Sequence, residues 1–236
     1  DGVLQSVPFS SLFGRKTGRY LVEDYLLEMA PSGTVFVRAS QAATSSARDR
    51  MSRALVVGNP RVDRKVWTGM QDLPGAEAEA VEIAALYPQA DLLVGSEATK
   101  AAFLAGMRNH QVVHFAGHAV ARDDAPSAAR LILAPDPSRG ALGTLFPHEV
   151  GQAGSGDTRL VVLAACRTAA GSISRVEGAL SLGRPFLAAG VPYLVASLWD
   201  IDDDLSRRFF VAFHRAVAEG AEPPQVLMSD IRMPGQ

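Results

Sequence analysis

The chain has 236 residues, of which 47% are hydrophobic and 20% charged, and its formal net charge is −2. This balance is that of an ordinary globular protein with one large or two small domains, and it gives no sign of a nucleic-acid groove or a polybasic membrane patch. No apolar run approaches the roughly 18 residues that a membrane-spanning helix needs. The chain begins at Asp1 without a positively charged leader, so export is not indicated and we expect a fragment or processed product of a longer protein.

Apolar runs alternate with amphipathic stretches, which predicts an α/β fold with a mostly parallel sheet flanked by helices. The run LVVLA (160–164) is apolar at every position, as expected for a strand with both faces covered. Thr99 can cap one helix, and the acidic group 202–204 suits the positive end of another helix dipole. In chain order we predict strand 54–58, helix 76–87, strand 91–94, helix 100–107, strands 112–115, 131–133 and 160–164, helix 177–189 ending at Gly190, strand 193–196, and a helix from 202 to about 218 ending at Gly220.

Two polar segments interrupt this pattern. Residues 38–52 (RASQAATSSARDRMS) are small and polar and are predicted to be a linker or surface loop, and 122–129 is a polar excursion between two strands. The chain contains neither a G-x-x-x-x-G-K-[ST] loop nor a G-x-G-x-x-G fingerprint, which disfavours a nucleotide-dependent switch. It also lacks the G-x-S-x-G elbow of a serine hydrolase.

Cys166 is the single cysteine of the chain. One cysteine forms neither an internal disulfide nor a multi-thiolate zinc site, which fits a reducing compartment such as the cytoplasm. Two interpretations of Cys166 are open. Free cysteine is most often a buried small apolar residue, and the other interpretation is a reactive thiol.

Two titratable residues follow predicted strands at their carboxyl ends, where open α/β sheets bind ligands. His118 follows strand 112–115, and Cys166 follows strand 160–164. If these strands are neighbours, the imidazole can activate the thiol, and the backbone amides of Gly117 and Cys166 can hold an oxyanion. The separation of 48 residues (166 − 118) is typical of caspases, where the histidine lies about 50 residues before the nucleophile.

The remaining histidines have structural interpretations. His114 lies inside a predicted strand and is expected to be a hydrogen-bonded core residue. His110 and His148 lie in loop contexts and are expected at the surface, as is His214 on the last helix. A metal site built from His114 and His118 lacks a third ligand at a familiar spacing, so no metal site is expected.

Seven segments, taken in order, resemble the CHAT domain, a family in the caspase, gingipain and separase clan of cysteine peptidases. The resemblance covers roughly residues 1–220 and implies a caspase-like (caspase–hemoglobinase) three-layer fold. The segments are VPFSSLFG (7–14), GRYLVEDYLLEMAPS (18–32), LPGAEAEA (73–80), LLVGSEATKAAFLAGM (92–107), VVHFAGHA (112–119), LVVLAACRTAAG (160–171) and RVEGALSLGRPFLAAGVPYLVASLWDIDD (175–203).

The resemblance assigns roles to four residues. His118 falls on the family's catalytic histidine and Cys166 on its nucleophile, which implies a cysteine-type endopeptidase that cleaves protein substrates and needs no cofactor. Family members are commonly gated by a helical-repeat or sensor region, in the same chain or in a separate one. The segment SLWDIDD (197–203) is similar to separase, where an aspartate after Leu-Trp-Asp lines the pocket for a basic side chain. Asp203 holds that position, with Asp200 as the alternative, and both carboxylates are equally well explained as caps of the last helix.

Three features depart from the family pattern. Ala119 stands where a Gly usually follows the catalytic histidine, and Arg167 stands where an acidic residue is common. The stretch QVLMSDIRMPGQ (225–236) replaces a closing amphipathic helix and resembles the phosphoacceptor strand of a receiver domain, with Asp230 at the acceptor position, but twelve residues cannot form that domain. Ala119 and the atypical C-terminus keep open an alternative, a catalytically inactive CHAT-like interaction or regulatory module.

The resemblance also predicts how the chain is divided. We expect residues 1–53 to be the N-terminal part of the CHAT region with its linker, residues 54–220 to be a caspase-like catalytic core, and residues 221–236 to be an atypical C-terminal tail.

Overall fold

A computed structural model describes residues 7, 9–25, 27–28, 30, 32–46, 50–120, 128–140, 142–165, 175–196 and 203–223. The side chains at 10, 45, 46, 139, 175–181 and 203 are not part of this description. Within the described ranges, no helix has both the length and the apolar character needed to cross a membrane.

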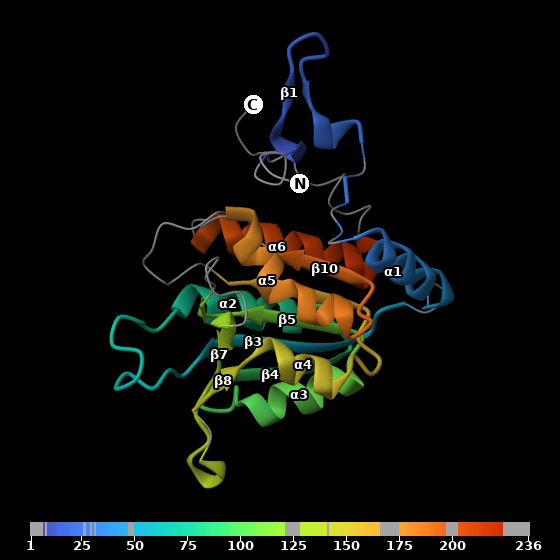
Figure 1. The fold of residues 1–236 in the computed structure, drawn as a ribbon. Coiled ribbons are helices and arrows are strands. Elements are labelled where there is room, and N and C mark those ends of the chain that lie inside the picture. The colour runs from blue at the N-terminus through green and yellow to red at the C-terminus, as the bar shows by residue number, and fades with distance from the viewer. Residues whose placement is uncertain are drawn as a thin grey trace.

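A five-stranded parallel sheet forms the centre of the molecule (Figure 1). Its strands pair in the order β10-β9-β5-β3-β4, so the direction of winding reverses between β3 and β5. Open α/β sheets bind ligands at such a switch point, outside the carboxyl ends of the strands. The strands are β3 (Arg53–Pro60), β4 (Gln89–Gly95), β5 (Val112–Ala116), β9 (Leu160–Ala164) and β10 (Tyr193–Ala196).

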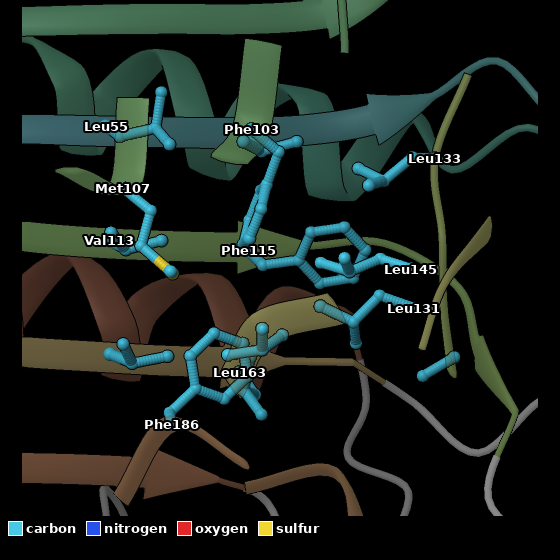
Figure 2. Close-up of a cluster of buried hydrophobic side chains, with 14 of the residues drawn as sticks. Leu55, Phe103, Met107, Val113, Phe115, Leu131, Leu133, Leu145, Leu163 and Phe186 are labelled. Carbon is cyan, nitrogen blue, oxygen red and sulfur yellow. The ribbon is translucent and has the colours of Figure 1, made fainter. Parts of the chain in front are cut away.

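Helices cover both faces of this sheet. Successive residues of a strand point to opposite faces, and β3 shows this directly: Leu55 and Val57 join one core cluster, while Ala54 and Val56 join the other. Figure 2 shows the first cluster, in which Phe103 and Phe186 from the helices pack over the sheet. On that face lie α3 (Lys100–Asn109), α4 (Pro147–Ala153) and α5 (Arg175–Ala188), and on the other lie α2 (Pro74–Ala84) and α6 (Asp203–Glu219).

A small antiparallel sheet continues the chain beyond β5. It is formed by β6 (Ala119–Val120), β7 (Arg130–Ile132) and β8 (Thr144–Leu145). Leu131 and Leu145 extend the first core cluster past the end of β5 (Figure 2). The chain that follows His118 is therefore anchored in a paired strand.

The predicted elements of the core are all present, with ends that differ by a few residues. The helix stops predicted at Gly190 and Gly220 are confirmed, since these residues have φ of 102° and 109°, a region in which only glycine is unstrained. The three-layer arrangement confirms the α/β, caspase-like fold class. The short elements β6, β8 and α4 were not predicted, because two-residue strands and a seven-residue helix show no usable periodicity.

The N-terminal region is more structured than the sequence predicted. It contains the hairpin β1 (Phe13–Gly14) and β2 (Arg19–Tyr20), which projects from the rest of the molecule in Figure 1, and the helix α1 (Gly33–Ser46). The prediction of a linker or loop over 38–52 is therefore wrong as far as Ser46. Its alanines favour a helix, and Ala39 and Ala42 are partly buried.

Candidate active site

The strands that precede the two candidate catalytic residues are neighbours. β5 pairs in parallel with β9, and Ala116 is the register partner of Ala164. The condition set by the sequence argument, that these strands are neighbours, is therefore met. His118 follows Ala116 at the carboxyl end of β5, while Cys166 lies outside the described residues, which end on this strand at Ala165.

His118 is a buried histidine with one nitrogen hydrogen-bonded and the other without a partner among the described residues. Its exposed fraction is 4%, and its Nε2 lies 2.7 Å from the backbone carbonyl oxygen of Gln71. A carbonyl oxygen only accepts hydrogen bonds, so Nε2 carries a hydrogen. The buried Nδ1 has no hydrogen-bond partner among the residues that the structure describes. In a neutral imidazole this nitrogen therefore holds the lone pair of a general base.

A buried polar atom without a partner costs about 1–3 kcal/mol, so a His118 Nδ1 that no described residue contacts by a hydrogen bond requires an explanation. Such atoms occur at catalytic sites, where the missing partner is a reacting group. The arrangement suits proton transfer at Nδ1 while the Gln71 carbonyl holds the ring in place.

The loop between β3 and α2 presents the Gln71 carbonyl to His118. Asn59 lies where the loop leaves β3. Its φ of 46° is left-handed, a conformation that asparagine tolerates better than most residues. Asn59 Oδ1 accepts a hydrogen bond of 2.8 Å from the Leu73 backbone N–H, and its Nδ2 donates to Glu77 Oε2 at 3.0 Å. Met70, the residue before Gln71, packs on the small sheet against Val120. The loop is thus held on both sides of Gln71, through Met70 and through Leu73.

The methyl group of Ala119 points away from His118. Adjacent residues of an extended chain face opposite sides, and Ala119 is 2% exposed within the first core cluster, close to Leu131, its partner in β7. The departure from the family's glycine therefore adds apolar contact in the core and leaves the His118 side of the strand unchanged.

Gly117 occupies a position where only glycine fits. A Cβ atom there would lie 2.9 Å from both Phe115 Cζ and Pro60 Cδ, closer than side chains pack. The ring of Phe115 is fully buried, so it cannot move aside cheaply. This crowding explains the glycine in structural terms, and an oxyanion role for its amide stays a prediction.

Several predicted site residues lie outside the described parts of the chain. These are Asp200, Arg167 and Asp230, as well as Cys166, and of Asp203 only its place as the first residue of α6 is described. The expected start of the last helix at the acidic group is confirmed.

A chain of buried polar side chains lies on the opposite face of the sheet, between β5, α2 and α6. His114 Nε2 contacts Glu79 Oε1 at 2.9 Å, and its Nδ1 contacts His214 Nε2 at 3.0 Å. His214 Nδ1 contacts the Tyr87 hydroxyl at 2.8 Å. The carboxylate accepts from His114, so when both imidazoles are neutral the hydrogen bonds run in one direction, from Tyr87 through His214 and His114 to Glu79. Ser206 Oγ donates to the second carboxylate oxygen at 3.4 Å.

This network decides the predictions for His114 and His214. His114 is fully buried and hydrogen-bonded, as predicted, and both of its ring nitrogens are occupied, which leaves none for a metal. The surface position expected for His214 is wrong, since it is also fully buried. The described residues contain no group of three or more His, Cys, Asp and Glu that could hold a metal ion.

The two other histidines differ from each other. The surface position expected for His110 is wrong, because it is 8% exposed and its Nδ1 lies 2.8 Å from the Gly106 carbonyl at the end of α3. Its Nε2 lies 3.3 Å from Asp91 Oδ2. His148 is exposed as predicted, although it belongs to the short helix α4 and not to a loop.

Acid is expected to destabilise the protein through His214. Burial, together with nearby His114, holds the pKa of His214 well below its ordinary value of 6.5. Below about pH 6.5, His214 therefore binds a proton in the unfolded chain but stays neutral in the folded chain. The free energy of unfolding then falls by up to about 1.4 kcal/mol for each pH unit of acidification. Above about pH 6.5 this contribution is complete and constant.

Urea unfolding between about pH 4.5 and 7.5 measures this effect, compared with the His214→Gln variant. Glutamine can accept from Tyr87 and donate to His114 but does not titrate, so the variant should lose stability less steeply in acid. Equal slopes for the two proteins would contradict the prediction.

The central parallel sheet between two helical layers, with a histidine at the carboxyl end of β5, defines a caspase-like α/β protein. A model of the CHAT domain family matches residues 1–230, and the chain belongs to this family. Tetratricopeptide repeat protein 28 of mouse is 26% identical over 267 residues, which cover 93% of this chain and 10% of that protein. The human protein of the same name is 26% identical over 274 residues, covering 96% of this chain and 10% of its own length. The chain thus spans about a tenth of the curated relatives that it matches.

Proposed function

We propose that this chain is a cysteine-type endopeptidase that cleaves protein substrates through a Cys166–His118 dyad. The observation that carries the proposal is the state of His118: its Nε2 is held by the Gln71 carbonyl, while its buried Nδ1 has no partner among the described residues. Membership of the CHAT family supports the same reaction class, because the family belongs to the clan of caspase-like cysteine peptidases.

The positions of the two residues in the sequence support a thiol close to this histidine. His118 and Cys166 each stand two positions after Ala116 and Ala164, which are register partners on adjacent strands. Neighbouring strands lie about 4.8 Å apart. Chain connectivity therefore supports a Cys166 thiol close to the imidazole.

In the proposed mechanism, Nδ1 of His118 takes the proton of the Cys166 thiol, and the thiolate attacks the peptide carbonyl carbon. The oxyanion that forms accepts hydrogen bonds from the backbone amides of Gly117 and Cys166. The imidazolium then donates its proton to the leaving amine, which leaves an acyl-enzyme. His118 next removes a proton from water, which attacks the thioester and releases the acid and the free thiol. Throughout, the Gln71 carbonyl stabilises the imidazolium through Nε2–H.

Three further features of the proposal come from the resemblance and the relatives. Asp203, with Asp200 as the alternative, would bind a basic side chain on the amino side of the cleaved bond. The relatives' name supports a helical-repeat region that gates the protease, in the same polypeptide or in a partner. Residues 54–220 would form the catalytic core, and a single cysteine favours a reducing compartment such as the cytoplasm.

Alkylation of the thiol tests the proposal. Cys166 is the single cysteine of the chain, so a cysteine-specific reagent reports on this residue alone. The rate of reaction with iodoacetamide is measured against pH for the folded chain and for the chain unfolded in urea. An adjacent imidazole should bring the midpoint of the folded chain below the ordinary thiol pKa of about 8.5, while the unfolded chain keeps that value. Peptide acyloxymethyl ketones ending in Arg, Leu or Asp should then label the folded chain selectively.

Two outcomes would contradict the proposal. A folded thiol that stays unreactive up to about pH 9 would be the buried apolar residue of the simpler interpretation. A midpoint equal to that of the unfolded chain, with no labelling by any peptide ketone, would favour an inactive interaction module.

A further inference from the structure

Arg130 lies on the same face of the small antiparallel sheet as His118. The register pairs Val120 with Arg130, and the Ile132 backbone N–H donates to the His118 carbonyl at 2.9 Å. Because side chains alternate along a strand, all four of these residues share one face. Diagonal neighbours on such a face are about 7–8 Å apart, within reach of a long side chain.

Two aromatic rings hold the Arg130 guanidinium. Its central carbon lies 5.1 Å from the ring centroid of Trp67 and 5.6 Å from that of Phe146. Stacking of this kind suits the planar, weakly hydrated guanidinium and keeps it in one orientation.

One described acceptor is hydrogen-bonded to the guanidinium. Nη1 donates to the Ala128 carbonyl at 3.0 Å, which occupies one of five N–H donors. No carboxylate of a described residue forms an ion pair with Arg130, and its side chain is only partly buried. A positive group that is oriented, partly shielded and not paired with a carboxylate of a described residue is suited to bind an anion.

Arg130 also borders a shallow hollow between the small antiparallel sheet, α4 and α5. Phe146 and Pro147 line it from the β8–α4 side, and Leu182 and Pro185 line it from α5. α5 is the first described element after Cys166. The hollow therefore lies between the chain that follows the candidate base and the chain that follows the candidate nucleophile.

We propose that Arg130 forms a subsite for an acidic side chain, Asp or Glu, of the peptide substrate. The carboxylate would accept two parallel hydrogen bonds from the guanidinium fork, while the stem of the substrate residue packs against the apolar wall of the hollow. The inference deepens the proposed peptidase function and rests on it.

A different role for Arg130 makes a distinct prediction. Trp67 lies on the same loop as Gln71, so Arg130 could act only by holding that loop against His118. A positioning role of this kind would affect all substrates equally, whereas a subsite affects only those with an acidic residue.

The test compares peptide pairs that differ only by Glu against Gln at single positions flanking the cleaved bond. For the unaltered chain, one Glu position should raise kcat/KM by about ten-fold or more, the usual effect of a charge-assisted hydrogen bond. Arg130→Gln should remove this preference while leaving cleavage of the Gln peptides largely unchanged. Arg130→Lys should keep only part of it, because an ammonium lacks the planar fork. The control Arg215→Gln, an exposed arginine on α6, removes the same charge and should change nothing.

An unaltered chain that shows no acidic preference at any position would overturn the proposal. So would an equal loss for Glu and Gln peptides in Arg130→Gln, which is the positioning result. If the chain cleaves no peptide, the peptidase function itself fails, and binding of the same peptide pairs to the Cys166→Ala variant, followed by fluorescence anisotropy, decides the subsite separately. Tighter binding of the Glu peptide that disappears in Arg130→Gln/Cys166→Ala supports it, and equal binding overturns it.

Discussion

Replacing His118 with glutamine is expected to lower kcat/KM for peptide cleavage by about 10²- to 10⁴-fold, the usual contribution of a general base. The amide group of glutamine can still donate to the Gln71 carbonyl, which His118 Nε2 contacts at 2.7 Å, so the side chain should keep its place. It cannot take a proton from the thiol. The midpoint of Cys166 alkylation should therefore return to about 8.5, the value of an ordinary cysteine. Steady-state kinetics and the alkylation profile measure the two effects independently.

Ala119→Gly is the matched control for this experiment. The methyl group of Ala119 packs in the core, on the side of the strand away from His118. The Ala119→Gly variant should therefore keep the rate of cleavage and the midpoint of Cys166 alkylation. It should lose about 1–2 kcal/mol of stability, from a lost methyl contact and a more flexible backbone. A loss of rate in Ala119→Gly as large as that in His118→Gln would show that the backbone, and not the imidazole, controls the reaction.

Removing the buried carboxylate of Glu79 is expected to cost about 3–5 kcal/mol of the free energy of unfolding. Its side chain is 4% exposed and accepts from the fully buried His114 at 2.9 Å. In Glu79→Ala, the Nε2–H of His114 loses its acceptor, a cavity opens between α2 and β5, and the hydrogen bonds with His214 and Tyr87 have no terminal acceptor. Urea unfolding at about pH 7.5, where His214 is neutral in both states, measures the change.

Two variants of the same helix separate the possible causes. Glu82→Ala removes an exposed carboxylate that pairs with Arg207 at 3.1 Å, and exposed pairs contribute only about 0–1 kcal/mol. Glu79→Gln keeps an oxygen that can accept from His114, so its cost should lie well below that of Glu79→Ala. Equal stability of Glu79→Ala and Glu82→Ala would mean that the buried network adds nothing to the fold.

The sequence predicted the core of the fold well, because the apolar runs of the strands and the amphipathic pattern of the helices are both strong there. The strands predicted at 160–164 (LVVLA) and 193–196 have the same bounds in the structure. The sequence left open whether β5 and β9 are neighbours, and the structure shows that they pair in parallel. The error at α1 has a local cause: small polar residues suggested a loop, while the alanines among them favoured a helix.

The histidine errors were of two kinds. His214 follows Phe210 by four residues and precedes Val217 by three, so it lies on the apolar stripe of α6, and this signal was available in the sequence. Gln71 offered no such signal. Its contribution is a backbone carbonyl, which every residue has, and a distant left-handed residue, Asn59, helps to aim it.

The sequence by itself determined which residues are candidates for chemistry and which strands carry them, because hydrophobic periodicity and strand-end position depend on neighbouring residues. Only the tertiary structure decided which nitrogen of His118 is free, where the methyl of Ala119 points and which rings hold Arg130. These depend on contacts between segments that are far apart in the chain, such as Gln71 with His118 and Trp67 with Arg130. Such contacts are set by how the layers pack, and no local pattern records them.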